Sequence, residues 1–205
     1  MTTANRPPAM HGTDHRNLAA PGRIGTRPDP QRRRLLQHAL GAAALGAGAL
    51  LVRPARANDL RLGELAPPLT LHTLDGQSVT TRELLGQVVI PTFWATWCAP
   101  CQEELPVLSA YAERHARDGL RVLGFSLDDA ADLAKVRAVA LTLKFPVGLL
   151  GSPYAGGYGR IWRCPVSFVI DRSGRLVDNG WDDSQPAWTP ERLKQIVDPV
   201  LARAS

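Results

Sequence analysis

From residue 60 onward, the hydrophobic positions follow two different periods, and segments of the two kinds alternate along the chain. An alternating or uninterrupted apolar run predicts a strand, whereas apolar residues three and four positions apart predict a helix with one buried face. Residues 88–94 are apolar almost throughout, which is typical of a strand buried on both faces. The predicted strands span residues 69–74, 78–79, 88–94, 121–127, 166–170 and 176–177.

The predicted helices lie mainly between these strands and begin at residues that cap helices well. Asp128 or Asp129 is predicted to cap one helix, and Thr189 is predicted to cap the last one. A shorter helix is predicted at residues 81–85. The longest predicted helix covers residues 98–117, and its apolar face consists of Cys101, Leu105, Leu108 and Ala112.

This order of elements predicts an α/β fold in which helices flank a mixed central sheet. Asp75 and Gly76 form a turn signal between the first two strands, so we expect an N-terminal β-hairpin extension. Pro91 lies inside the strand at residues 88–94, where it cannot donate a ladder hydrogen bond. We therefore expect a bulge, or an N–H position that faces an edge, at Pro91.

The positive charge of the chain is concentrated in its first 57 residues. The full chain of 205 residues has a formal charge of +5. Residues 1–57 contain nine arginines and two acids, a net charge of +7, whereas residues 58–205 contain 15 basic and 17 acidic residues, a net charge of −2. The net positive charge of the chain therefore comes from residues 1–57, and it does not support nucleic-acid binding by the rest of the chain.

The leader has the layout of an export signal. Residues 1–31 are rich in Pro, Gly, Thr and Arg without apolar periodicity, which predicts a disordered segment. Residues 32–57 begin with a basic cluster before two leucines, continue with a weakly apolar stretch, and end in Ala55-Arg56-Ala57. This pattern predicts a twin-arginine-type signal peptide, cleaved after Ala57, that meets the membrane only during export to the periplasm. Retention of the segment as an anchor stays open.

Two cysteines at a predicted strand-to-helix junction carry the candidate chemistry. Cys98 and Cys101 are three positions apart in the first helical turn, where they can close a small disulfide ring. The N–H groups and the dipole of a helix N-terminus stabilise a thiolate there. We expect Cys98 to be the exposed attacking thiol and Cys101 the more buried resolving thiol of a redox disulfide.

The surroundings of this pair resemble a known family. Residues 93–106, with Trp94 and Trp97 before the cysteines and Glu104 and Pro106 after them, closely resemble the active-site segment of the TlpA/ResA/CcmG group of exported thioredoxin-like proteins. The similarity extends from about residue 62 to residue 204 and includes residues 63–71 and 164–174. The resemblance implies a thioredoxin-like domain over residues 58–205.

The resemblance also implies roles for single residues. Pro165 is expected to be cis, and the backbone of Cys164 before it is expected to hold an incoming peptide as an extra strand. Trp97 is expected to contact the substrate. Glu104 is expected to line a cavity beneath the active site and to move a proton or select a partner; the alternative is a solvated carboxylate in the first turns of a helix.

The implied activity is that of a thiol-disulfide oxidoreductase without a cofactor or a resident metal. The Ala-Pro pair between the cysteines supplies no histidine or lysine that would stabilise the thiolate further, unlike strong oxidants. The resemblance therefore favours a reductase for cysteine-bearing partner proteins, of the cytochrome c or copper-site maturation type. A membrane thiol donor of the DsbD/CcdA kind would re-reduce it.

A peroxidase is disfavoured, because peroxide-reducing members of this superfold usually use one isolated attacking cysteine.

Cys164 departs from the family pattern, which usually has a residue without a thiol at this position. Three thiols could converge here, so a Cys98–Cys164 disulfide, a sulfenic acid and a Cu(I) site are all open alternatives. The opposing interpretation is a small apolar side chain in the substrate groove. The alternative function is thus a soft-metal binding module or metallochaperone that uses Cys98, Cys101 and Cys164.

Overall fold

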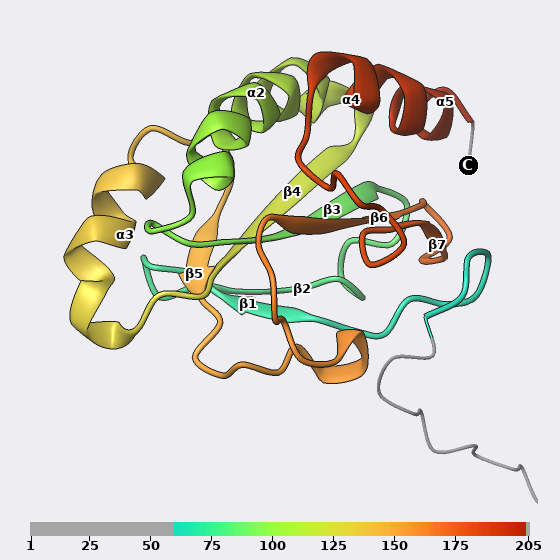
Figure 1. Ribbon diagram of the computed structural model, residues 1–205. Helices are drawn as coiled ribbons and strands as arrows, with labels where there is room; N and C mark the ends of the chain where they lie inside the picture. The colour runs from blue at the N-terminus through green and yellow to red at the C-terminus, as the bar shows by residue number, and fades with distance from the viewer. Residues whose placement is uncertain (1–59, 204–205) are drawn as a thin grey trace, which may run out of the picture. The chain divides into compact units, whose positions relative to one another are not determined.

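The computed structural model describes residues 60–203, in which a two-stranded hairpin accompanies a five-stranded sheet (Figure 1). The expected leader, signal peptide and cleavage site in residues 1–57 lie outside the described residues. Within residues 60–203, no helix is both long enough and apolar enough to span a membrane.

The central sheet is mixed, as predicted. Its strand order is β5-β4-β3-β6-β7, with β3 in the middle. Strands β3, β4 and β5 run parallel, whereas β6 pairs antiparallel with both β3 and β7. The bounds of the strands are Val88–Trp94 for β3, Leu120–Ser126 for β4, Val147–Leu149 for β5, Val166–Ile170 for β6 and Leu176–Asn179 for β7.

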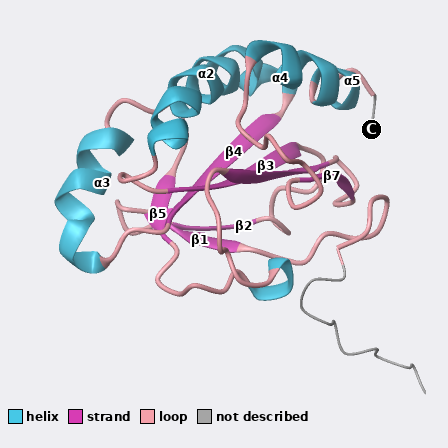
Figure 2. Cartoon of the chain, viewed as in Figure 1, coloured by secondary structure: helices cyan, strands magenta, loops and turns pink. Residues whose placement is uncertain are grey.

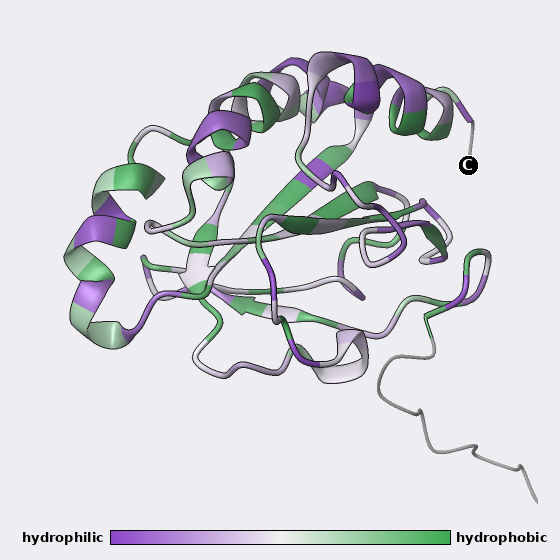
Figure 3. Cartoon of the chain, in the orientation of Figure 1, coloured by the Kyte–Doolittle hydropathy of each residue, from purple (hydrophilic) through white to green (hydrophobic). Residues whose placement is uncertain are grey.

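The continuous apolar run of β3 is explained by burial on both faces of the sheet. All seven residues of β3 are buried. Because side chains alternate along a strand, Ile90 and Trp94 belong to one core cluster, and Val89 and Phe93 belong to another. Figure 3 shows the same concentration of hydrophobic residues in the central strands.

Helices supply the core on one face of the sheet. The buried faces of α2, α3 and α4 contribute Leu105, Val136 and Leu193 to the same cluster as Trp94. Thr189 is the N-cap of α4, as predicted, and its side chain accepts a hydrogen bond from the Arg192 N–H at 3.2 Å. The helices are α2 (Ala99–His115), α3 (Leu133–Ala140), α4 (Pro190–Ile196) and α5 (Asp198–Leu201), with short 3₁₀ turns at η1 (Ala116–Asp118), η2 (Ala130–Asp132) and η3 (Gly156–Tyr158).

The predicted N-terminal hairpin covers the other face together with the long loop between β5 and β6 (Figure 2). Strands β1 (Thr70–His72) and β2 (Ser78–Thr80) pair antiparallel, and Leu71 is buried in the second core cluster. The hairpin approaches β5 so closely that a Cβ atom on Gly148 would lie 2.0 Å from the His72 carbonyl oxygen. A glycine at this position is therefore a steric requirement.

Two local predictions were wrong. Residues 81–86 form successive turns instead of a short helix. The Thr81 hydroxyl accepts the Leu69 N–H at 3.1 Å, so it joins this segment to the hairpin and does not cap a helix. Pro91 produces no bulge, because β3 keeps an unbroken register with β4, and its pairs with β6 on either side of Pro91 share one register. Pro91 does not face an edge either, because β3 is the central strand of the sheet. The irregularity lies instead between β6 and β7.

Candidate active site

The Cys98–Cys101 disulfide lies where β3 has ended and α2 begins. The two Cα atoms are 5.3 Å apart, and Cys98 is the N-cap of α2, with its Sγ atom 3.3 Å from the Cys101 N–H. Cys98 is only 4% exposed, so the expectation of an openly exposed thiol was too strong. The predicted difference between the cysteines remains, because Cys98 lines a surface cleft and Cys101 is fully buried.

This cleft has a volume of about 870 Å³, and its walls come from four separate segments of the chain. Trp97 and Cys98 belong to the segment that precedes α2, and Trp162 and Cys164 to the segment that precedes β6. Both tryptophan side chains are exposed, Trp97 by 68% and Trp162 by 69%. The structure therefore brings together Trp97, Cys98 and Cys164, which the sequence places up to 67 residues apart.

The segment before β6 carries the expected cis-proline. The Cys164–Pro165 peptide bond is cis, and Pro165 is buried. The Sγ atom of Cys164 lies within 4.8 Å of those of Cys98 and Cys101. Burial, together with smaller contributions from the nearby carboxylates of Asp128 and Glu104, raises the pKa of the Cys164 thiol to about 11. Cys164 is therefore a protonated thiol at neutral pH.

Asp128 holds the loop that leads to Cys98, a role that the sequence did not indicate. Its carboxylate accepts hydrogen bonds from the Thr96 N–H at 2.9 Å and the Thr96 hydroxyl at 2.5 Å. It also accepts the Ser126 hydroxyl at 2.7 Å. Asp128 was one of two candidates for a helix cap; the structure instead uses it to connect the end of β4 to the active-site loop.

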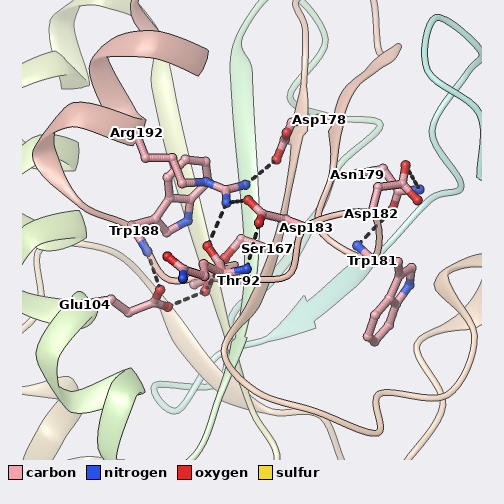
Figure 4. A network of polar contacts seen from close by, with 12 residues as sticks. Thr92, Glu104, Ser167, Asp178, Asn179, Trp181, Asp182, Asp183, Trp188 and Arg192 are labelled. Carbon is pink, nitrogen blue, oxygen red and sulfur yellow. Dashed lines mark hydrogen bonds and ion pairs between the residues drawn. The ribbon is translucent and has the colours of Figure 1, made fainter.

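Glu104 lies on the buried part of α2. Its side chain is only 2% exposed, one helical turn after Cys101. One carboxylate oxygen accepts the Trp188 N–H at 2.8 Å, and the other lies 3.5 Å from the Thr92 hydroxyl (Figure 4). Desolvation raises the pKa of Glu104 from 4.5 to about 7, although both hydrogen bonds and Arg192 act to lower it. The solvated-carboxylate alternative is therefore wrong.

Two further polar groups extend this buried arrangement. The Ser167 hydroxyl donates to the Thr92 hydroxyl at 2.8 Å. This hydrogen bond joins β6 to β3 at the residue that contacts Glu104. Arg192 on α4 lies over the Trp188 ring at 4.7 Å and forms ion pairs with Asp178, at 3.0 Å, and with Asp183. Figure 4 shows how this arginine joins α4 to the segment that carries Trp188.

These supporting residues escaped sequence reasoning for understandable reasons. Thr92 and Ser167 occur inside strands, where hydroxyl side chains are common without any functional role. Trp188 acts through its backbone N–H, which leaves no trace in a residue pattern. The one available signal was a polar residue within a strand that is otherwise buried on both faces.

A disulfide-bonded C-x-x-C motif at a helix N-terminus, a cis-proline in the same cleft and a mixed sheet behind them define a thioredoxin-like thiol-disulfide oxidoreductase. Comparison with known sequences agrees: residues 62–178 match the profile of the AhpC/TSA family, and the chain belongs to this family.

The chain is similar to named thiol-disulfide oxidoreductases. It is 30% identical over 120 residues to the thiol-disulfide oxidoreductase ResA of Bacillus thuringiensis, an alignment that covers 58% of this chain and 69% of that protein. It is 32% identical over 119 residues to the thioredoxin-like protein YneN of Bacillus subtilis, covering 57% of this chain and 69% of that protein. The expected family and the oxidoreductase activity are thereby confirmed.

Solved structures agree with the fold. A thiol:disulfide interchange protein of the thioredoxin family from Chlorobium tepidum is 27% identical, with a TM-score of 0.56, and the match covers 70% of this chain and 99% of that one. A candidate DsbE from the same organism is 26% identical, with a TM-score of 0.60 and the same coverage of both chains. The predicted thioredoxin-like α/β architecture is confirmed.

Proposed function

We propose that this protein is an exported reductase of disulfides in specific partner proteins, of the kind that mature cytochrome c or copper sites. The observation that carries the redox direction is the burial of the redox pair, since Cys98 is only 4% exposed and Cys101 is fully buried. Next to the pair lies Cys164, whose thiol is influenced by the carboxylates of Asp128 and Glu104. A strong oxidant depends on a stabilised thiolate in its reduced form. Burial and negative charge have the opposite effect on a thiolate, and so favour a reducing potential.

The proposed reaction starts from the dithiol form. The Cys98 thiolate attacks one sulfur of the partner's disulfide, and the other partner sulfur leaves as a thiolate that takes up a proton. Cys101 then loses its proton and attacks Cys98 Sγ, which releases the second partner thiol and forms the Cys98–Cys101 disulfide. The partner gains two electrons and two protons, and the protein loses them. A membrane thiol donor of the DsbD/CcdA kind would restore the dithiol.

In this proposal, Glu104 accepts the proton that Cys101 must lose. Two features of Glu104 support that role: its place one helical turn from Cys101, and its pKa of about 7, which lets it exchange a proton at neutral pH. The Thr92–Ser167 hydroxyl pair and the Trp188 N–H keep the carboxylate oriented. A carboxylate at the protein surface, with a pKa near 4, would be a much weaker base for a thiol.

The partner would lie in the cleft as an extended peptide. Trp97 and the backbone around Cys164 and Pro165 would contact it, because Trp97 and Cys164 line the cleft together with Cys98. The exposed rings of Trp97 and Trp162 offer apolar surface to residues that flank the partner's cysteine. Export by the twin-arginine route is part of the proposal, and its support is the pattern of residues 32–57.

The decisive experiment is to trap the mixed disulfide. A Cys101→Ser variant cannot resolve the intermediate, so we expect it to accumulate as a dithiothreitol-sensitive adduct whose attached protein is identified by mass spectrometry. The matched control is the double variant Cys98→Ser, Cys101→Ser, which should form no adduct. An adduct that forms equally in the control would contradict the assignment of Cys98.

The redox direction has its own measurement. We expect the potential of the Cys98–Cys101 couple, equilibrated with glutathione or dithiothreitol buffers, to lie below about −200 mV. A value near that of the strong oxidant DsbA, about −120 mV, would overturn the reductase proposal and leave the oxidoreductase class intact.

A further inference from the structure

We propose that the reduced protein binds one Cu(I) ion through the sulfur atoms of Cys98, Cys101 and Cys164. Metal binding would be an activity separate from disulfide reduction, although it uses the same two redox cysteines. Disulfide reduction gives Cys164 no chemical step, whereas metal binding makes it the third ligand. Bound Cu(I) would hold the protein in its dithiol form and block disulfide exchange until the metal is removed.

The three sulfur atoms converge from two separate parts of the fold. Cys98 and Cys101 lie in the first turn of α2, and Cys164 precedes β6, where the cis peptide bond to Pro165 sets the course of the chain. All three Sγ atoms lie within 4.8 Å of one another. A metal with bonds of about 2.3 Å to three sulfurs in a plane requires separations of about 4 Å between them. Opening of the 2.06 Å disulfide bond moves Cys98 and Cys101 toward that separation.

The donor set favours Cu(I) over zinc. Thiolate ligands select soft metals, and zinc in structural sites takes four ligands. Among residues 60–203, the cluster contains three cysteines and no histidine or carboxylate as a fourth ligand. Both methionines of the chain, Met1 and Met10, precede the described region. A three-sulfur site without a fourth donor suits the low coordination number of Cu(I).

Burial and charge suit a cation that must be kept away from water. Cys101 is fully buried and Cys98 nearly so, whereas Cys98 and Cys164 both line the cleft and leave a path for the metal. Asp128 and Asp129 also line this cleft. The two aspartates place negative charge beside the sulfurs, which favours a bound cation.

Binding would be controlled by the redox state of the protein. In the disulfide form, Cys98 and Cys101 are bonded to each other, so two of the three ligands are lost. Two electrons and two protons convert that disulfide to two thiols, after which Cu(I) displaces protons from the sulfurs. The copper does not change its oxidation state in this step.

The test is an anaerobic titration of the fully reduced protein with Cu(I) in competition with bicinchoninate, a chromophoric Cu(I) chelator. We expect one Cu(I) per chain, at least tenfold weaker binding by Cys164→Ala, and no competition by the oxidised protein. Ser152→Ala is the matched control, because it alters the same cleft without removing a sulfur, and it should bind Cu(I) as the unaltered protein does. Circular dichroism and a thiol count check that each variant is folded and reduced.

X-ray absorption spectroscopy of the copper-loaded protein provides the second readout. We expect three sulfur ligands in the unaltered protein and two in Cys164→Ala. Equal affinities of these two proteins for Cu(I), or a two-sulfur site in the unaltered protein, would overturn the proposal, because a C-x-x-C pair alone would then account for the binding. Tighter binding of Zn²⁺ than of Cu(I) would overturn the assignment of the metal.

Discussion

At the scale of single residues, the most informative group is the carboxyl of Glu104. It is almost completely buried, and its three nearest polar partners are an N–H group, a hydroxyl and, further away, a guanidinium. Hydrogen bonds and Arg192 favour the charged form, but desolvation outweighs them and sets the pKa at about 7. The carboxyl is thus half-protonated near neutral pH, where a group that relays protons is most useful.

This pKa predicts a pH-dependent effect of Glu104→Gln on stability. The folded-state pKa lies above the ordinary value of 4.5, so protonation stabilises the fold below that value, and this stability is lost as pH rises through 7. Glutamine cannot ionise. From pH 5 to pH 8 we therefore expect the unfolding free energy of Glu104→Gln to increase relative to the unaltered protein by roughly 2–3 kcal/mol. Urea unfolding of both oxidised proteins measures it, and a pH-independent difference would contradict the assigned pKa.

The same substitution separates a proton-relay role from a structural one. If Glu104 accepts the Cys101 proton, the rate at which Cys101 resolves a mixed disulfide should rise through a pH of about 7 in the unaltered protein. That inflection should be absent in Glu104→Gln, with a rate at least tenfold lower at pH 8. Stopped-flow measurement with a preformed mixed disulfide gives both values. An unchanged pH profile would remove Glu104 from the proposed mechanism.

At the scale of elements, the placement of Glu104 depends on how α4 is attached to the sheet. Arg192 on α4 pairs with Asp178 in β7 and with Asp183 in the following loop, and it also lies over the Trp188 ring. This loop continues to the Trp188 N–H that holds Glu104. The Arg192 side chain therefore connects α4 and the edge strand β7 to the loop that holds the buried carboxylate.

Loss of that side chain should affect both stability and the site. Arg192→Ala leaves Asp178 and Asp183 without their cation, and we expect it to lower the unfolding free energy by about 3 kcal/mol. Because Arg192 lowers the pKa of Glu104, the midpoint of the pH–rate profile should also move upward. Lys194→Ala, an exposed change on the same helix, is the control and should alter stability by less than about 0.5 kcal/mol. Equal effects of the two substitutions would contradict the role given to Arg192.

At the scale of the whole molecule, charge divides the chain into two parts of opposite sign. Residues 1–57 have a net charge of +7, and residues 58–205 have a net charge of −2. The redox site lies entirely in the second part. A basic leader and a slightly acidic domain are consistent with the proposed export of a folded enzyme.

Removal of the leader is directly measurable. N-terminal sequencing of the exported protein should give Asn58 as the first residue, because the predicted cleavage motif Ala55-Arg56-Ala57 ends at Ala57. Replacement of Arg33 and Arg34 by lysine should stop export by the twin-arginine route and leave the precursor inside the cell. A mature protein that begins upstream of Arg53 would contradict the cleavage site.

Local sequence patterns were enough to predict most of the elements and the redox pair. Four features could be predicted from residues that are neighbours in the sequence. They are the burial of both faces of β3, the hairpin at Gly76, the cap at Thr189 and the spacing of the two cysteines. The resemblance to a family added the cis-proline and the importance of Glu104. Residues 81–86 were misassigned because Thr81 bonds to the hairpin, 12 residues away, instead of to its own turn.

By itself, the sequence determined the fold class, the Cys98–Cys101 pair and the division of charge, since these depend on short-range pattern and composition. Only the tertiary structure decided the environment of the sulfurs and of Glu104. The Trp188 N–H reaches Glu104 across 84 residues, and Cys164 meets the redox pair across more than 60. Desolvation, which sets the pKa of Glu104, is produced by packing from many segments at once, and no local pattern of residues encodes it.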